Sequence, residues 1–319
     1  MRRLLSVILL LTVVWWTQPS HAQEGGLSEE QLTLLERLLT ALAQPYTNYM
    51  LDSTNLNTQI ITITIPNEFS GTAIQNNSRV VKRVKVGDDL SAQVTATASY
   101  REPEADTPFS YTINAQIRRV NQLLYANAVY ETALANLPVL PSGWVTIENP
   151  ADWPALTELA LADYLPRTDQ SRPTLEDLLA QDRALIEQII TDIQSSPNTL
   201  TDGTPVDIIT LKLDFQAMLA SDLGLDYSAA TLDAVTLGAL LSDATIQFTA
   251  AFTLNSQGQV IGRQVVLTIQ AEGIAAAALS ADIPAGTTID LSVTQTENSF
   301  YTRINDSTLP AIEAPLDAP

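Results

Sequence analysis

The hydrophobic pattern opens with a helical period near the start of the chain. Leucines recur at spacings of three and four between about Leu27 and Gln44, which places them on one stripe of a helix. Ser28, with Gln31 three residues later, is the pattern of a capping box at a helix start. The sequence therefore predicts an amphipathic helix here. Its stripe consists of Leu35, Leu38, Leu39 and Leu42.

The period then changes from helical to alternating. Between about Thr58 and Glu148, apolar residues stand at every second position, separated by threonine, asparagine or glutamine. Turn residues interrupt the runs at Pro66-Asn67 and Gly87-Asp88-Asp89. Such runs predict antiparallel strands with one buried and one solvated face. The clearest contain Ile61, Ile63 and Ile65; Val94, Ala96 and Ala98; and Tyr111, Ile113, Ala115 and Ile117.

A helical period returns between about Pro150 and Pro205. Thr174 and Asp177 are typical of a helix start, and we expect the helix that they open to stop at Ser196-Pro197. Its apolar residues include Leu178, Leu185, Ile186, Ile189, Ile190 and Ile193. Two interpretations stay open for this aliphatic helix, because a lid over a cavity and ordinary core packing beneath a sheet show the same spacing.

Strands and helices alternate over the rest of the chain. Strands are expected at 208–215, 246–254, 261–269, 287–294 and 299–304, and helices at 216–225 and 229–241. This order favours an α+β fold: a large curved antiparallel sheet, an incomplete half-barrel of roughly ten or eleven strands, covered on its concave face by helices. We expect one domain over residues 23–308 with a helical insert at about 150–204, and a flexible proline-rich tail at 309–319.

Composition and charge narrow the range of functions. Of the 319 residues, 45% are hydrophobic and 16% are charged, which is the composition of a folding chain. The formal net charge of -20 gives a surface that repels phosphate backbones. Nucleic acid is therefore not expected as a partner.

The first 22 residues predict a signal peptide. Met1-Arg2-Arg3 is a basic start, and the apolar run from Leu4 to Trp16 is shorter than the ~20 residues of a membrane-spanning helix. Ser20-His21-Ala22 places small residues where a signal peptidase reads the chain. We expect cleavage after Ala22 and a secreted protein, periplasmic or extracellular. An uncleaved anchor is the alternative.

Cleavage would remove His21, the one histidine of a chain that has no cysteine. A mature chain without either residue lacks the means for a Ser-His-Asp or Cys-His catalytic site and for an ordinary zinc site. It also lacks a cysteine for lipid attachment. We therefore expect no enzyme, no metal, no cofactor and no lipid anchor.

Acidic residues leave two further interpretations. A carboxylate-dependent hydrolase needs two acids about 5 to 9 Å apart across a cleft. Asp202-Gly203 and Asn305-Asp306 are weak candidates for calcium binding. Acids in loops and first helical turns are usually solvated, so both interpretations rank below ligand binding. The candidate acids are Glu29, Glu30, Asp88, Asp89, Glu102 and Glu104.

Three segments carry a resemblance to a known group of proteins. They are Gln122-Leu-Leu-Tyr125 followed by Tyr130 and Gly143-Trp144, the hairpin from Phe252 to Ile261, and the closing strands between Ile289 and Pro310. In this layout the chain resembles the periplasmic lipoprotein-carrier superfamily of LolA-like and LppX/LprG-like proteins. The resemblance implies a hydrophobic cleft between a curved sheet and helices, in which the acyl chains of a lipid or lipoprotein are held.

We therefore predict a secreted, non-enzymatic carrier or binder of lipids or lipidated proteins, a monomer that contacts membranes transiently. The alternative is an extracellular scaffold or adhesion module with a fully packed core and no ligand. An acyl chain needs only an apolar lining, because each sheltered methylene contributes about 0.8 kcal/mol. The expected lining comprises Ile61, Ile63, Ile113, Tyr125, Trp144, Leu178, Leu185, Ile186, Ile189, Leu211, Leu213, Phe248 and Phe252.

Basic residues gather at Arg79, Lys82, Arg83 and Lys85. One interpretation is that Arg79, Arg83 and Lys85 contact an anionic head group or a membrane surface. Strand alternation places Arg83 and Lys85 on one face and Lys82 on the other. A solvated outer face of the sheet is therefore the favoured interpretation of the cluster.

Aromatic residues add two expectations. Trp144 and Trp153 flank the helical insert, where a buried structural role is favoured over the mouth of a cleft. Tyr125 and Tyr130 are five residues apart on one strand and point to opposite faces, so at most one of them faces a cleft.

Overall fold

The structure is a computed structural model of the chain. It describes residues 27–103, 107–131, 137, 139–149, 159, 161–164, 183–214, 244–276 and 283–316. Several predictions therefore lie outside the described residues: the signal peptide at 1–22, Trp153, the helix from Thr174 up to Asp182, Phe215, and the helices at 216–225 and 229–241.

The described chain contains eleven strands and a few helical segments. The strands are β1 (Asn48–Ile65), β2 (Phe69–Val86), β3 (Asp89–Arg101), β4 (Phe109–Val120), β5 (Leu123–Tyr130), β6 (Val145–Ile147), β7 (Ile190–Thr199), β8 (Pro205–Leu213), β9 (Thr245–Leu254), β10 (Val260–Ala275) and β11 (Thr288–Thr302). The helices are α2 (Glu29–Leu42), α4 (Arg183–Ile189) and the 3-10 helix η3 (Leu161–Tyr164).

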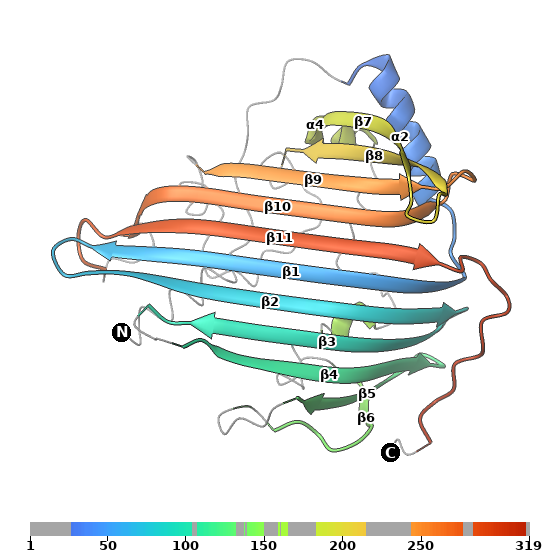
Figure 1. The fold of residues 1–319 in the computed structure, drawn as a ribbon, viewed down its shortest axis with the longest axis horizontal. Coiled ribbons are helices and arrows are strands. Elements are labelled where there is room, and N and C mark those ends of the chain that lie inside the picture. Colours follow the sequence, from blue (N-terminus) through green and yellow to red (C-terminus); the bar gives the residue numbers. More distant parts are fainter. Residues whose placement is uncertain are drawn as a thin grey trace.

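All eleven strands belong to one antiparallel sheet in the order β6-β5-β4-β3-β2-β1-β11-β10-β9-β8-β7 (Figure 1). Strands that are consecutive in sequence are neighbours in the sheet, except that β6 and β7 lie at opposite edges. In addition, β1 pairs with β11 and thereby joins the two parts of the sheet. The sheet stays open, with β6 at one edge and β7 at the other. The prediction of a single large, open antiparallel sheet is confirmed. Helical cover over its whole concave face stays a prediction.

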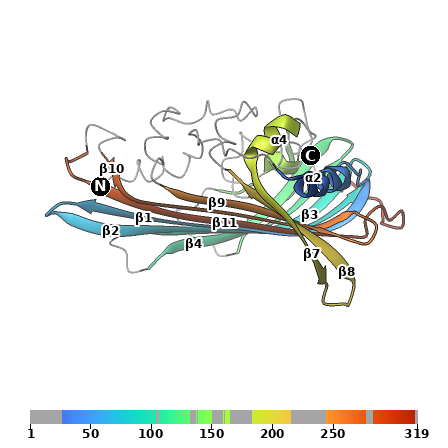
Figure 2. The same cartoon turned by 90° about the horizontal axis from the view of Figure 1, so that it is seen from above.

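Helix α2 forms where its capping signal and its leucine stripe predict it. The Ser28 side chain accepts a hydrogen bond from the Gln31 backbone N–H, and the Gln31 side chain accepts one from the Ser28 N–H, which completes the capping box. Leu35 and Leu38 are fully buried against side chains of β8 and β9. Helices α2 and α4 lie on the same side of the sheet (Figure 2), which we call the inner face.

The predicted long helix ends earlier than its pattern indicates. Helix α4 stops at Ile189, and Ile190 to Thr199 form edge strand β7 instead. The register with β8 shifts between Ile190 and Asp192, so an extra residue is inserted there and the buried Ile190 and Ile193 stand three apart, as they would on a helix. Pro197 has no N–H to donate, and an edge strand accommodates it. The prediction of helix through Ile193 is therefore wrong from Ile190 onward.

The buried side chains form three clusters on the sheet. One joins α2 and α4 to β7–β11, and it contains Leu35, Leu38, Leu211 and Phe252. A second joins η3 to β2–β6. A third lies around Ile61 and Ile289, at the C-terminal end of β1 and the N-terminal end of β11. In the described part of the chain, no helix is long and apolar enough to span a membrane.

The segment after β11 runs along the ends of the strands toward β4 (Figure 1). Leu309 and Pro315 are buried, and Arg118 Nη1 donates to the Glu313 carbonyl oxygen at 3.0 Å. This segment has no regular secondary structure over residues 310–315, in line with an extended tail. Its flexibility stays a prediction.

Candidate ligand-binding face

The faces of the sheet follow from the strand register. Directly opposed residues share a face, so the inner face can be traced from the strands beneath α2 to the other edge. Leu211, Ala250, Val265, Glu297, Asn55, Arg79, Ala96, Ile113 and Tyr130 form one such row across the sheet. The inner face therefore changes from aliphatic to polar and back to apolar along this row.

The half of the inner face on β7–β10 carries large side chains. Phe252, Leu211 and Ile209 are completely buried there, in the cluster that includes Leu35 and Leu38 of α2. An ion pair between Arg37 Nη1 and Asp207 Oδ2 holds the helix at the margin of this cluster. We call this region the aliphatic half. Helix α2 of the same chain packs against the aliphatic half.

The half on β3–β5 carries five buried alanines at inner positions, among larger aliphatic residues. We call this set the alanine floor, and it consists of Ala92 and Ala96 of β3, Ala115 of β4, and Ala126 and Ala128 of β5. Ile113 and Ile117 stand between these alanines, and Leu159, Leu161 and Tyr164 belong to the same cluster. Its other members are Val81, Leu90, Val94, Leu124 and Ile147. A floor of methyl groups lies closer to the backbone than one of leucines, so it accommodates a thicker layer above it.

A polar stripe separates the two halves along the middle of the inner face. It consists of Ser53, Asn55, Asn57 and Gln59 of β1, Gln75, Asn77 and Arg79 of β2, and Gln295, Glu297 and Ser299 of β11. Gln59 and Ser299 are buried, and Asn57 Oδ1 is inaccessible to solvent with no hydrogen bond among the described residues. Arg263 of β10 pairs with Glu297 at its margin. Sequence analysis missed this stripe.

Arg83 lies at one end of the inner face, beside the alanine floor. It pairs with Leu51 of β1 and Ala92 of β3, and its guanidinium carbon lies 4.8 Å from the centre of the Tyr164 ring. Burial would lower the pKa of Arg83, but the phenol groups of Tyr164 and Tyr49 outweigh it and raise that pKa, so the side chain stays a cation. Its Nε is inaccessible to solvent and makes no hydrogen bond within the described residues.

These positions correct the interpretation of the basic cluster. Arg83 and Lys85 do share a face, and Lys82 with Val80 takes the other, as alternation predicts. The shared face of Arg83 and Lys85 is the inner one, however, so a solvated outer face is the wrong explanation for these two residues. Lys85 Nζ donates to the Tyr46 carbonyl oxygen at 3.3 Å and lies 5.8 Å from the centre of the Tyr49 ring.

The predicted lining residues do not form a single group. Ile186, Ile189, Leu211, Leu213, Phe248 and Phe252 belong to the aliphatic half. Ile113 belongs to the cluster of the alanine floor, and Ile61 and Ile63 to the third cluster. Leu178 lies outside the described residues, and of Leu185 only the backbone is described.

Tyr125 and Trp144 are placed wrongly by the prediction. Tyr125 pairs with Arg118 and points away from the buried Leu124 and Ala126, so it lies on the outer face. Trp144 stacks against the same Arg118, whose guanidinium carbon lies 5.2 Å from the indole centre. Tyr130, the other tyrosine of this strand, shares the inner face with Ala126 and Ala128. The predicted opposition of the two tyrosines is therefore confirmed.

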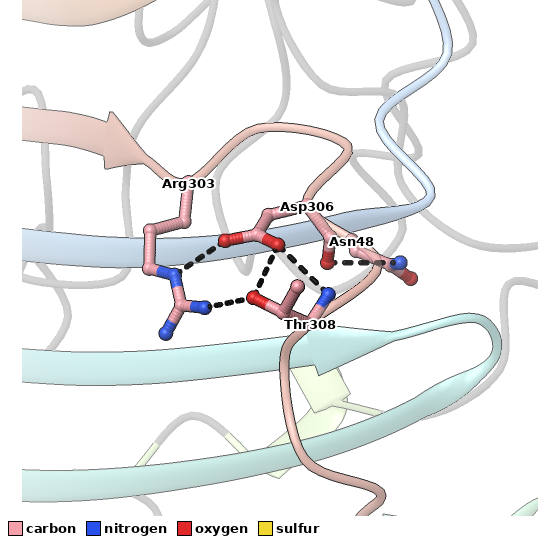
Figure 3. A network of polar contacts seen from close by, with 4 residues as sticks. All are labelled: Asn48, Arg303, Asp306 and Thr308. Carbon is pink, nitrogen blue, oxygen red and sulfur yellow. Dashed lines mark hydrogen bonds and ion pairs between the residues drawn. The ribbon is translucent and has the colours of Figure 1, made fainter.

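Asp306, proposed above as a weak calcium ligand, has other partners (Figure 3). Its Oδ1 accepts hydrogen bonds from Thr308 N at 2.8 Å and Thr308 Oγ1 at 2.6 Å, and its Oδ2 accepts one from Arg303 Nε at 2.7 Å. The Thr308 hydroxyl, the Thr308 N–H and Arg303 lower the pKa of Asp306 to about 2. The Asn48 side chain donates to the Asp306 carbonyl oxygen. The carboxylate thus fastens the end of β11, which contradicts a calcium site.

The candidate catalytic acids are dispersed over the fold. Glu29 and Glu30 occupy the first turn of α2, Asp88 and Asp89 lie at the turn between β2 and β3, and Glu104 lies outside the described residues. Asp202 Oδ1 accepts a hydrogen bond from Thr204 N within a turn. Over the described ranges, no three acidic or histidine side chains are grouped to hold a metal ion.

No protein-family profile and no curated protein sequence matches the chain. Among solved structures, LprF from Mycobacterium bovis matches over 91% of this chain and 100% of its own, with 12% identity and a TM-score of 0.27. A LolA superfamily protein from Nitrosomonas europaea matches over 88% and 94%, with 10% identity and a TM-score of 0.17. A DUF1329 family protein from Desulfovibrio piger matches over 89% and 96%, with 7% identity and a TM-score of 0.18.

The first two matches come from the groups that the sequence resembles, LppX/LprG-like and LolA-like proteins. At TM-scores this low, the matches transfer neither a ligand nor an activity to this chain.

Proposed function

We propose that the protein is a secreted, non-enzymatic carrier or binder of lipids or lipidated proteins, and that an acyl chain lies over the alanine floor. The observation that carries the proposal is the contrast in side-chain size across one continuous face, where the rows of Phe252 and Leu211 lead to Ala128 and Ala96 in the other half. Buried alanines are more numerous on the strands of this half than in the aliphatic half, where Ala250 is one, and smaller side chains leave more depth above the sheet.

The energetics suit a ligand of this kind. A C16 acyl chain that is fully sheltered gains on the order of 10 kcal/mol before the costs of association and ordering. Ile113 and Ile117 give the floor apolar ridges, and the polar stripe beside it offers hydrogen bonds to a polar group attached to the chain. Such binding requires no metal, cofactor or nucleophile.

The experiment is native mass spectrometry of the protein purified from its own cell envelope, followed by lipid extraction. The proposal predicts a mass increment that disappears on extraction and an acyl-containing species in the extract. The same protein, after extraction, should rebind a fluorescent acyl probe with one site. A chain that carries no amphiphile from its envelope and binds no acyl probe would contradict the proposal.

A packed scaffold is the second candidate, and a specific observation favours it. Ala96, Ile113 and Ala126 are almost completely buried by the chain itself. Acyl binding therefore requires the residues that cover this half to be displaced, whereas a scaffold requires no movement. Amide hydrogen exchange distinguishes the two, since an acyl ligand should protect residues 159–164 and β3–β5 in a carrier and change nothing in a scaffold.

Location and assembly belong to the same proposal. We propose cleavage after Ala22, a mature domain that ends near residue 308 before a flexible tail, a helical lid over the inner face, and a monomer that meets membranes only transiently. N-terminal sequencing of the secreted protein tests the cleavage site, and light scattering tests the monomer. Sedimentation with anionic vesicles tests the membrane contact.

A further inference from the structure

The middle strands of the inner face are basic although the protein is acidic. The formal net charge of the chain is -20. On the described strands β1–β4, β10 and β11, however, the inner ladder positions hold five cations and a single carboxylate, Glu297. The five cations are Arg79, Arg83, Lys85, Arg119 and Arg263. On the inner ladder positions of these strands, the cations thus outnumber the carboxylates.

Arg83 is a cation that lies beside phenol groups. It forms no ion pair with a carboxylate of the described residues, and its partners there are the neutral phenols of Tyr49 and Tyr164. Its Nε is buried and makes no hydrogen bond to any described residue. Withdrawing a cation from water costs several kcal/mol unless an anion pairs with it. The phenols of Tyr49 and Tyr164 favour the cation, but neither supplies the negative charge of a carboxylate.

The surroundings of Arg83 indicate which kind of anion would fit there. Its neighbour across β3 is Ala92, and the row continues through Ile117 to Ala126 of the alanine floor. An apolar surface thus begins directly at the guanidinium group. Guanidinium groups bind carboxylates through paired hydrogen bonds, and phenol hydroxyls add a further donor.

We propose that Arg83, with Tyr49 and Tyr164, binds the carboxylate of a long-chain acid whose hydrocarbon chain extends over the alanine floor. This inference rests on the proposed function and narrows its ligand to free acids. The carboxylate takes the place of the ring of Tyr164 on the guanidinium group, and Lys85 adds a second positive charge 5.8 Å from the centre of the Tyr49 ring.

The experiment compares palmitate with 1-hexadecanol, which has the same chain and no charge, by displacement of a fluorescent acyl probe. Wild-type protein should bind palmitate at least tenfold more tightly than the alcohol. Arg83→Gln should reduce that preference to less than about threefold, because it removes a charge-assisted hydrogen bond and leaves the apolar contacts. Lys82→Gln is the matched control, since it removes the same charge from the outer face of the same strand, and it should keep the preference.

Each outcome separates this inference from the proposed function. Equal binding of acid and alcohol by wild-type protein overturns the inference and leaves acyl binding intact, whereas binding of neither probe overturns both. Hexadecyl phosphate is the third probe, and a tenfold preference for it over palmitate overturns the assignment to a carboxylate.

A measurement on wild-type protein covers the case in which Arg83→Gln fails to fold. The carboxyl resonance of bound palmitate labelled with 13C at that carbon should titrate at lower pH than in neutral detergent micelles, because a neighbouring cation lowers the pKa of a carboxyl group. Titration at the micellar pH or above it overturns the inference.

Discussion

The two halves of the inner face bury side chains of different size under different covers. The aliphatic half places Phe252, Leu211 and Ile209 against Leu35 and Leu38 of α2, so large residues meet a helix of the same chain. The alanine floor presents methyl groups instead. The comparison teaches that one sheet can contain a part that stabilises the fold and a part whose dimensions suit a guest.

The polar stripe explains how the two halves stay distinct. Asn55, Asn57 and Gln59 lie between them on β1, the strand that also joins the two ends of the chain through β11. Over the length of the stripe, these polar side chains separate the apolar side chains of the two halves. Each half can be altered separately, which makes the comparison open to experiment.

The largest expected effect is in the aliphatic half. Phe252→Ala should lower the free energy of unfolding by about 3 to 5 kcal/mol, because the side chain is completely buried and leaves a cavity beneath α2. Urea denaturation measures the change. The affinity of the folded variant for an acyl probe should equal that of wild-type protein. A tenfold loss of affinity would place the ligand in the aliphatic half, against this account.

A smaller effect separates the halves through ligand linkage. At a ligand concentration 100 times its Kd, wild-type protein should gain about 2.7 kcal/mol in unfolding free energy. Ala96→Leu should gain much less, because a larger side chain on the floor occupies the place of the acyl chain. Asn127→Leu introduces the same residue on the outer face of β5 and should gain as much as wild-type protein. Equal gains for both variants would refute the placement of the ligand.

The polar stripe should tolerate loss of charge poorly. Glu297→Gln leaves Arg263 on the inner face without its partner, and we expect a loss of about 2 kcal/mol in unfolding free energy, below the full cost of a completely buried pair. Lys212→Gln breaks the exposed pair with Asp192 and should cost less than about 0.5 kcal/mol. Equal losses in urea denaturation would show that the stripe is as solvated as the surface.

The smallest effect concerns the network around Asp306, which fastens the tail beyond both halves. The folded pKa of about 2 is below the ordinary value of 3.8, so the carboxylate stabilises the fold above about pH 4 and the stabilisation is lost as the pH falls toward 2. Asp306→Asn should therefore be less stable than wild-type protein at pH 6 and equally stable near pH 2. If the difference in stability between wild-type protein and the variant is the same at both pH values, the charge of Asp306 does not stabilise the fold.

Local signals in the sequence account for much of the fold. Helix α2 was predictable because Ser28 and Gln31 mark its start and leucines mark one stripe, and most strands were predictable from alternation. Strand β7 was missed because the register shift after Ile190 gives it a helical spacing. Such an irregularity depends on the partner strand and leaves no local signal.

The candidate site was less predictable than the fold. The polar residues of the stripe on β1 stand at odd positions, namely Ser53, Asn55, Asn57 and Gln59. That these positions face inward follows only from the register with β2 and β11. The face of Arg83 likewise depends on distant segments, because Tyr164 of η3 covers it. The basic cluster itself was visible in the sequence, whereas the face of the sheet on which its side chains lie is decided by tertiary packing.

Photochemical mapping tests the central contrast most directly. Palmitate that carries a diazirine at mid-chain is bound to wild-type protein and irradiated, and the labelled peptides are identified by mass spectrometry after digestion. An acyl chain over the alanine floor predicts labels within residues 89–130, the span of β3–β5. Labels confined to residues 205–270, or no label at saturating ligand, would contradict the account.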